Sequence, residues 1–209
     1  MNTLQYILNK FQIQQPSEKL PIEIPNFGRN QMAELFCELN FKVGLELGVE
    51  SGAFSNIICK ANPGVKLYCV DAWVSYGEYR HYVSQETIDA FYENAKKTLA
   101  PYNTKLIKGL SMDVVETFVD ESLDFVFIDG NHTYDFVTQD VTEWSKKVRP
   151  GGIVSGHDYI RKASQNNGVI EALRDFTELN KIDPWFVLGR KETIPGEIRD
   201  KSRTWMYVK

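Results

Sequence analysis

The chain has 209 residues and a formal net charge of -4, and 43% of its residues are hydrophobic. This length and composition suit a single folded domain with a full core. The 24 basic and 28 acidic residues are mixed along the sequence without a basic stripe, which argues against nucleic acid as a partner. The sequence lacks the apolar stretch of a signal peptide or a membrane span, so we expect a cytoplasmic protein with no membrane partner.

The first forty residues are expected to form an extension that precedes the main domain. Apolar residues at helical spacing predict a short helix within residues 1–12 and a second one around residues 32–39. Between them QQPSEKLPIEIP carries three prolines, which predicts an extended connector. This 1–40 extension could make a dimer contact or cover the active site, so a homo-oligomer remains among the expectations.

From residue 43 onward, apolar runs alternate with helical patterns. The apolar runs predict strands at 43–47, 65–70, 105–109, 123–129 and 152–157. Helical spacing marks the segments 54–61, 88–99, 114–118 and 134–148. Because each intervening helix returns the chain to the same end of the sheet, these strands should pair in parallel.

Two aromatic-rich runs near the C-terminus, WFVLGRK and RTWMYVK, have no helix between them and predict an antiparallel hairpin. Together with the five earlier strands, this hairpin gives a doubly wound, mostly parallel, seven-stranded α/β sheet of Rossmann-like type. We expect Asp140, Trp144 and the turn RPGG to belong to the scaffold of this sheet and its helices.

The first of these strands ends in a glycine loop, ELGVESGAFS. Gly48 and Gly52 allow a tight turn and a close approach of the main chain to a ligand. The spacing differs from that of dinucleotide sites, and Glu46 would repel a pyrophosphate but attract an amine or a sulfonium. The next strand ends in Asp71, from which a carboxylate can accept hydrogen bonds from ribose hydroxyls. The alternatives are a plain tight turn and an aspartate that caps the next segment.

A second polar cluster is expected where the fourth and fifth strands end. Asp129 and His132 follow one strand, and His157 and Asp158 follow the other, so the four side chains can converge. A divalent cation there could bind an acceptor oxygen and lower its pKa, while a general base takes the proton. Asp129, Asp158 and His157 suit the metal, and His132 suits the base with Asp129 beside it. Two alternatives stay open: His157 lies outside the metal's ligand shell, or no metal binds and His132 works alone.

These motifs resemble those of the class I S-adenosylmethionine-dependent methyltransferases. ELGVESGAFS is similar to the family's motif of an acidic residue followed by Gly-x-x-x-Gly, and VDAW to its acidic ribose-binding position. The resemblance covers about residues 41–209 and implies that Glu46, Gly48 and Gly52 surround the methionine portion of S-adenosylmethionine. It also implies that Asp71 binds the ribose and that Ser111 lies near the adenine, where a serine that caps a helix is the alternative.

The segments IDGNHTYDFVTQDVTEW and RPGGIVSGHDY resemble one subgroup, the metal-dependent macrolide-sugar (macrocin-type) O-methyltransferases, and more distantly the catechol O-methyltransferases. This resemblance implies O-methylation of a small sugar-like or phenolic acceptor with a divalent metal. His157 stands where an oxygen ligand is usual in that subgroup. Magnesium prefers oxygen donors and imidazole suits manganese better, so both Mg and Mn remain candidates.

The loop 72–85 supplies four aromatic residues together with Arg80 and His81. It could form a lid over the acceptor or a surface loop packed by its own rings. Two other functions remain as alternatives: a nicotinamide-dependent oxidoreductase on a related fold, and a non-catalytic module that binds the cofactor.

Overall fold

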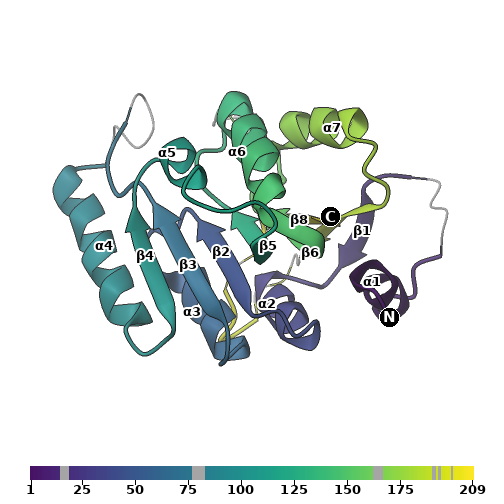
Figure 1. Ribbon diagram of the computed structural model, residues 1–209, viewed down its shortest axis with the longest axis horizontal. Helices are drawn as coiled ribbons and strands as arrows, with labels where there is room; N and C mark the ends of the chain where they lie inside the picture. Colours follow the sequence, from purple (N-terminus) through teal and green to yellow (C-terminus); the bar gives the residue numbers. More distant parts are fainter. Residues whose placement is uncertain (15–18, 77–82, 162–166, 190–191, 193, 199) are drawn as a thin grey trace.

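An eight-stranded sheet with helices on both faces forms the centre of the protein (Figure 1). The computed structural model describes residues 1–14, 19–76, 83–161, 167–189, 192, 194–198 and 200–209. The strands are β1 (Ile22–Pro25), β2 (Val43–Leu47), β3 (Lys66–Asp71), β4 (Thr104–Lys108), β5 (Leu123–Ile128), β6 (Val148–Gly156), β7 (Trp185–Gly189) and β8 (Thr204–Val208). The helices are α1 (Thr3–Lys10), α2 (Arg29–Glu38), α3 (Ala53–Ala61), α4 (Gln85–Leu99), α5 (Ser111–Val115), α6 (Tyr134–Lys147) and α7 (Val169–Leu179).

The strand order is β1-β7-β8-β6-β5-β2-β3-β4. Strand β8 runs antiparallel to both β6 and β7, and the other neighbouring strands pair in parallel. The predicted doubly wound sheet and its C-terminal antiparallel hairpin are therefore confirmed. The order reverses between β2 and β5, and ligands of such sheets bind at that switch point, beyond the carboxyl ends of the strands.

The structure has one strand more than predicted, because β1 pairs in parallel with β7. The proline-rich connector is extended as expected, but Ile22 lies opposite Phe186 and Ile24 opposite Leu188. The prediction missed this pairing because prolines weaken a strand signal. At the edge of a sheet, however, prolines are tolerated, since one side of the strand needs no hydrogen-bond donor.

Helix α7 was also absent from the prediction, which passed from the fifth strand directly to the hairpin. Its buried residues, Val169, Ala172, Leu173 and Thr177, recur at helical spacing, so the prediction overlooked a periodic signal that the sequence contains. Helix α7 joins β6 to β7, two strands that run in the same direction because each is antiparallel to β8. The short helix predicted at 114–118 begins earlier, at Ser111.

Alternate residues of the strands supply two separate cores, one on each face of the sheet. Phe125 and Phe127 of β5 join the core under α2, α3 and α4, whereas Val126 and Ile128 join the core under α5, α6 and α7. Ile7 of α1 and the strand β1 belong to the first of these cores. Residues 1–40 are thus packed into the same body as the rest of the chain.

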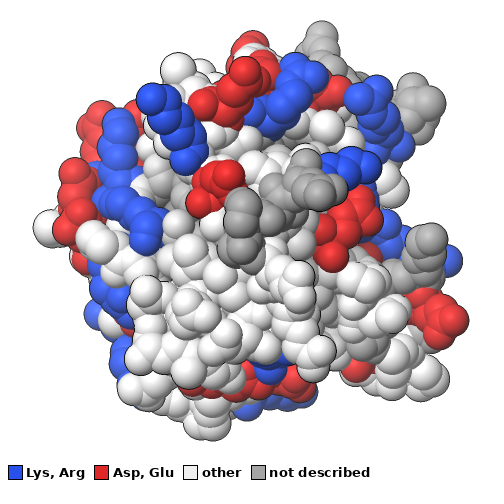
Figure 2. Space-filling model, turned by 90° about the vertical axis from the view of Figure 1, so that its right-hand side faces the viewer, with Lys and Arg blue, Asp and Glu red and all other residues white. Residues whose placement is uncertain are grey.

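The edge of the sheet formed by β1 lies near α1, and Figure 2 shows the molecule from this side. This face has a broad uncharged area. Lys and Arg side chains alternate with Asp and Glu around the area rather than gathering into one basic patch. Among the described residues, every helix is too short or too polar to cross a membrane.

We expect the contact between α2 and the sheet to be a main source of stability. Phe36 is fully buried and stacks on Phe125, with ring centroids 4.0 Å apart. Phe36→Ala should lower the free energy of unfolding by about 3–5 kcal/mol, because it removes a buried ring and leaves a cavity. In the control, Leu179→Ala removes a side chain that is 82% exposed and should change stability by less than about 0.5 kcal/mol. Urea denaturation measures both, and equal losses would contradict the assignment.

Candidate functional site

The glycine loop after β2 is held between the two neighbouring strands. Gly48 donates its N–H to Val70 (2.8 Å), and Asp129 donates its own to Leu47 (2.7 Å). Gly48 has a φ of +89°, and a Cβ at this position would collide with the carbonyl oxygen of Asp129. Only a residue without a side chain therefore fits between the ends of β3 and β5.

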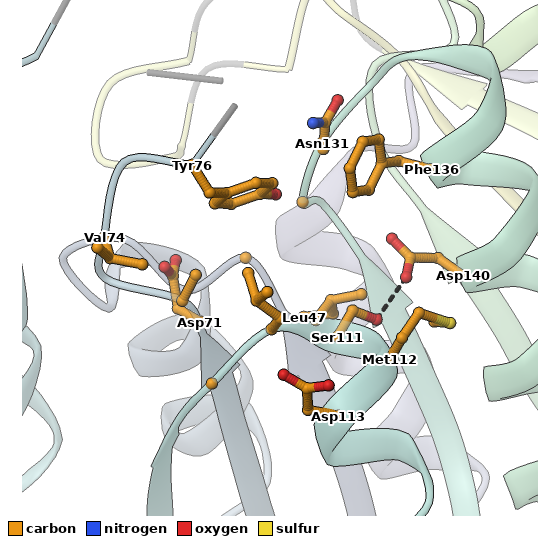
Figure 3. A pocket seen from close by; sticks show the side chains of 15 residues that line it. Leu47, Asp71, Val74, Tyr76, Ser111, Met112, Asp113, Asn131, Phe136 and Asp140 are labelled. Carbon is orange, nitrogen blue, oxygen red and sulfur yellow. Dashed lines mark hydrogen bonds between the residues drawn. The ribbon is translucent and has the colours of Figure 1, made fainter. Parts of the chain in front are cut away.

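A pocket of about 730 Å³, including its open mouth, lies beyond these strand ends (Figure 3). Gly48, Asp71 and Ser111, three of the residues expected to bind the cofactor, line it together. Among the described lining residues the charged ones are Asp71, Asp113 and Asp140, which are all acidic. The pocket is therefore unsuited to a phosphate group and suited to a ligand that donates hydrogen bonds or carries positive charge.

Asp71 connects the glycine loop to the turn after β3. Its Oδ2 accepts the N–H of Glu50 at 2.9 Å, and its Oδ1 accepts the N–H of Trp73 at 2.8 Å. Each carboxylate oxygen has two lone pairs, so the group can still accept hydrogen bonds from ligand hydroxyls. Asp71 is thus fixed in place while it keeps capacity for a ribose.

Glu46 and Gly52 do not line the pocket. The Glu46 carboxyl is 2% exposed and accepts a hydrogen bond from the Ser55 hydroxyl of α3. Burial raises the pKa of Glu46 to about 8, although the hydrogen bond from Ser55 works in the opposite direction. Gly52, with a φ of +84°, lies against Leu99 of α4. Their predicted contact with a methionine portion remains a prediction.

Asp140 belongs to the pocket, although the sequence pattern placed it in the scaffold. The Ser111 hydroxyl donates to its Oδ1, and the Trp144 indole N–H donates to Ser111 Oγ at 2.8 Å. Burial raises the pKa of Asp140 to about 7, against the lowering effect of Ser111. No local motif indicates this role, because Ser111 and Asp140 meet only when α5 packs against α6.

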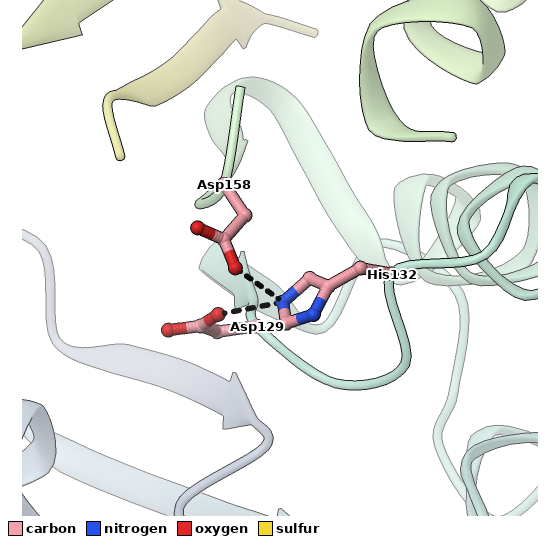
Figure 4. A group of neighbouring side chains, drawn as sticks. All are labelled: Asp129, His132 and Asp158. Atoms are coloured by element: carbon pink, nitrogen blue, oxygen red, sulfur yellow. Dashed lines mark hydrogen bonds and ion pairs between the residues drawn. The ribbon is translucent and has the colours of Figure 1, made fainter. Parts of the chain in front are cut away.

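The second predicted cluster also assembles, at the ends of β5 and β6 (Figure 4). His132 Nε2 lies 3.1 Å from Asp129 Oδ1 and 3.2 Å from Asp158 Oδ2. One ligand atom from each of these residues lies within 4.8 Å of the others, so the three could hold a metal ion. Two carboxylates and one imidazole form a donor set that fits a divalent cation. Gly130 and Asn131, which follow Asp129, line the pocket, so the two clusters are adjacent.

His157, predicted as a metal ligand, lies beside this triad of Asp129, His132 and Asp158. Its Nδ1 is 3.7 Å from Asp129 Oδ2 and 3.9 Å from Asp158 Oδ1, and its Nε2 is 3.0 Å from Asp200 Oδ1. Asp200 thus engages one ring nitrogen, and the other faces the carboxylates of the triad. The structure therefore groups His132 more closely than His157 with the two aspartates.

Sequence reasoning missed Arg29 and Asp200, which support the triad from behind. Arg29 Nε lies 3.0 Å from Asp200 Oδ1, and its Nη1 lies 3.5 Å from Asp129 Oδ2. Burial alone would raise the pKa of Asp129, but the hydrogen bond from His132 and the charges of His157 and Arg29 bring that pKa down to about 2. Arg29 begins α2 and Asp200 precedes β8, so no local motif could have linked them.

Comparison with known proteins agrees with this arrangement. Residues 45–159, more than half of the chain, match the family described as "Methyltransferase domain". The chain belongs to this methyltransferase family. The match runs from β2 through the end of β6 and so contains both the glycine loop and the triad.

Solved structures similar to this methyltransferase share its fold. TomG, an O-methyltransferase from Streptomyces achromogenes involved in tomaymycin synthesis and solved with SAM, has a TM-score of 0.59 at 17% identity, over 99% of this chain and 89% of TomG. An O-methyltransferase from Bacillus cereus in complex with SAH has a TM-score of 0.57 at 17% identity, over 99% of this chain and 90% of that one. Spermidine synthase from Thermotoga maritima also matches, with a TM-score of 0.58 at 14% identity, over 88% of this chain and 59% of that one. The fold therefore does not by itself determine the acceptor.

A relative from Mycobacterium sp. (strain JLS), named provisionally as an O-methyltransferase, is 33% identical over 86 residues. This match covers 39% of the methyltransferase chain and 38% of the relative. The predicted resemblance to the macrocin-type subgroup is not specifically supported by these comparisons.

The predicted lid at 72–85 is described only in part. Residues 77–82, with Arg80 and His81, lie outside the described residues, and Tyr76 lines the pocket.

The buried carboxyl of Glu46 predicts a pH-dependent stability. The folded state raises its pKa from 4.5 to about 8, so it keeps a proton that the unfolded state loses in this window. The free energy of unfolding should therefore fall as the pH rises from about 5 to 8, by up to about 1.4 kcal/mol per pH unit for this group. Glu46→Gln should flatten that slope, as measured by urea denaturation at several pH values.

The exposed Glu34 of α2 provides the control for this experiment. Glu34→Gln should leave the slope of the parent protein intact. Equal slopes for Glu46→Gln and the parent protein would contradict the protonated state of Glu46.

Proposed function

We propose that this methyltransferase transfers a methyl group from S-adenosylmethionine to a hydroxyl oxygen of a small, sugar-like or phenolic acceptor. One observation supports this proposal above the others: a pocket with acidic lining at the bare glycine loop adjoins the triad of Asp129, His132 and Asp158. The complexes of TomG with SAM and of the Bacillus cereus enzyme with SAH are consistent with it.

The pocket residues would bind and orient the cofactor. S-adenosylmethionine, when bound, supplies an electrophilic methyl group on a positively charged sulfur. Asp71 would accept hydrogen bonds from the ribose hydroxyls, and the main chain at Gly48 allows the ligand to approach the end of β2. The acidic lining would favour a cationic ligand over an anionic one. In our proposal, Glu46 stabilises the glycine loop through its hydrogen bond with Ser55 of α3.

The triad would prepare the acceptor oxygen. A divalent cation held by Asp129, Asp158 and an imidazole would, when bound, lower the pKa of an acceptor hydroxyl. His132 has two proposed roles that depend on this cation. With it, His132 completes the ligand set at Nε2. Without it, His132 Nε2, oriented by the two carboxylates, accepts the acceptor's proton.

The pocket lining argues against the alternative function, a nicotinamide-dependent oxidoreductase. A dinucleotide places a doubly charged pyrophosphate at the glycine loop, usually with N–H groups or cationic side chains to receive it. Asp71 and Asp113, and Asp140 in its ionised form, would instead repel that charge. S-adenosylmethionine carries no phosphate, so the same lining suits it.

Thermal unfolding with two ligands separates these functions. S-adenosylhomocysteine at about 100 times its Kd should stabilise the protein by about 2.7 kcal/mol, a rise in Tm of roughly 5–10 °C. NADH at the same concentration should leave the Tm unchanged. Gly48→Ala should abolish the shift, because its Cβ collides with Asp129.

Gly64→Ala is the control, because a Cβ at Gly64 meets nothing within 4 Å. This variant should keep the full shift with S-adenosylhomocysteine. A shift with NADH alone would refute the proposed function in favour of the oxidoreductase.

Manganese titration by calorimetry tests the triad. Asp129→Asn and Asp158→Asn should each weaken Mn²⁺ binding at least about tenfold, because each removes an anionic ligand. Asp89→Asn, at an exposed position on α4, should bind Mn²⁺ as the parent protein does. Equal affinities in all four proteins would refute the metal site.

The two histidines can be separated in the same experiment. His132→Ala should retain S-adenosylhomocysteine binding and lose most methyl transfer. Loss of Mn²⁺ binding in this variant identifies His132 as a ligand, whereas its retention identifies His132 as the base. Unchanged turnover would remove His132 from both roles, and loss of Mn²⁺ binding in His157→Ala alone would assign the imidazole ligand to His157.

A further inference from the structure

The two oxygens of the Asp129 carboxylate face different partners. Oδ1 lies 3.1 Å from His132 Nε2. Oδ2 points away from His132 in Figure 4 and lies 3.5 Å from Arg29 Nη1 and 3.7 Å from His157 Nδ1. The backbone at the end of β5 fixes where this side chain begins, but rotation about the Cβ–Cγ bond of an aspartate is only loosely restricted. The partners of Oδ2 therefore determine which way Oδ1 faces.

Arg29 is itself held by a second carboxylate. Its Nε lies 3.0 Å from Asp200 Oδ1, and its backbone N–H donates to Asp200 Oδ2 at 3.0 Å. Arg29 is buried, and the carbon of its guanidinium lies 5.6 Å from the centroid of the Phe54 ring. Because a guanidinium is planar and rigid and carries five N–H donors, it can bond two carboxylates through different nitrogens at once. One side chain thus connects Asp129 to Asp200.

The segment that contains Asp200 is fixed against the first turn of α2. Ile198 donates its backbone N–H to Asn30 Oδ1 at 3.0 Å. A Cβ on Gly28 would lie 2.8 Å from Asp200 Oδ2, so this carboxylate lies directly against the main chain where the helix begins. The carboxylate that holds Arg29 is therefore fixed by close contact between two segments of backbone.

We propose that Arg29 is a positioning residue that determines the cation affinity of the triad. Arg29 binds Asp129 at Oδ2 and leaves Oδ1 facing His132, while Asp200 holds the guanidinium in place. This inference rests on the proposed function, because it takes the triad as the site of a divalent cation. Loss of a group that orients a metal ligand typically costs about 10- to 100-fold in metal affinity. The start of α2, within the 1–40 segment expected to be an extension, thus belongs to the surroundings of the triad.

An orienting role and a simple charge effect predict different results. A positive charge beside the triad repels a cation. If Arg29 acted only through its charge, Arg29→Gln would tighten Mn²⁺ binding and Arg29→Lys would leave it unchanged. An orienting role predicts weaker binding in both variants. Lysine retains the charge, but its single nitrogen cannot reproduce the planar guanidinium that bonds Asp129 and Asp200 through separate nitrogens.

Calorimetric titration with Mn²⁺ tests the proposal. Arg29→Lys and Arg29→Gln should each weaken Mn²⁺ binding at least about tenfold. Both variants should bind S-adenosylhomocysteine as the parent protein does, because Arg29 is not among the described residues that line the pocket. Asp200→Glu keeps the charge but displaces the carboxylate from Arg29 and Gly28, and it should weaken Mn²⁺ binding severalfold.

Arg149→Lys is the matched control, because Arg149 makes the same two kinds of contact at the opposite end of the sheet. Its Nε lies 2.7 Å from Asp124 Oδ1, and the carbon of its guanidinium lies 5.4 Å from the centroid of the Phe41 ring. Arg149 and Asp124 lie near the starts of β6 and β5, whereas Asp158 and Asp129 follow the ends of these strands. Arg149→Lys should therefore keep the affinities of the parent protein for Mn²⁺ and for S-adenosylhomocysteine.

The outcomes separate failure of this inference from failure of the proposed function. If the parent protein binds neither ligand, the proposed function fails. If the parent protein binds S-adenosylhomocysteine but not Mn²⁺, this inference fails and the cofactor proposal stands. If both ligands bind, unchanged Mn²⁺ affinity in Arg29→Lys or tighter binding in Arg29→Gln would refute the orienting role. Equal losses of both ligands in Arg29→Lys and Asp200→Glu would also refute it, because a purely structural ion pair would produce that result.

Discussion

The close backbone packing around Gly48 is the constraint on which the rest of the site depends. The end of β2 is bonded to β3 through Gly48 and to β5 through Asp129, and a side chain at Gly48 would strike the Asp129 carbonyl. The same few atoms therefore fix the glycine loop, the wall of the pocket and the origin of the triad. The positions of the pocket and of the triad, which are adjacent, thus both depend on this backbone contact.

The carboxyl groups around this contact are of two kinds, which differ in their partners. Asp129 has cationic and histidine neighbours that hold its pKa at about 2, so it is an anion at neutral pH. Among the described residues, Glu46 and Asp140 each have one hydroxyl partner, and burial raises their pKa values to about 8 and about 7. Negative charge is thus concentrated at Asp129, whereas Glu46 and Asp140 interact mainly through hydrogen bonds.

Local patterns were enough to predict the sheet, the hairpin and the convergence of Asp129, His132 and Asp158, because strand ends of parallel strands must meet at one edge. They failed where the decisive contact joins distant segments. Strand β1 is defined by its pairing with β7, and Asp140 enters the pocket because α5 packs on α6. Arg29 and Asp200 meet across most of the chain length. Periodicity contains no information about such encounters.

The ion pair between Arg29 and Asp200 joins two segments that lie far apart in the sequence. The residues that line the pocket all lie between Leu47 and Asp140. The ion pairs behind Asp129 involve Arg29 at the start of α2 and Asp200 in the segment before β8. The surroundings of Asp129 are therefore complete only when segments that are far apart in the sequence have come together.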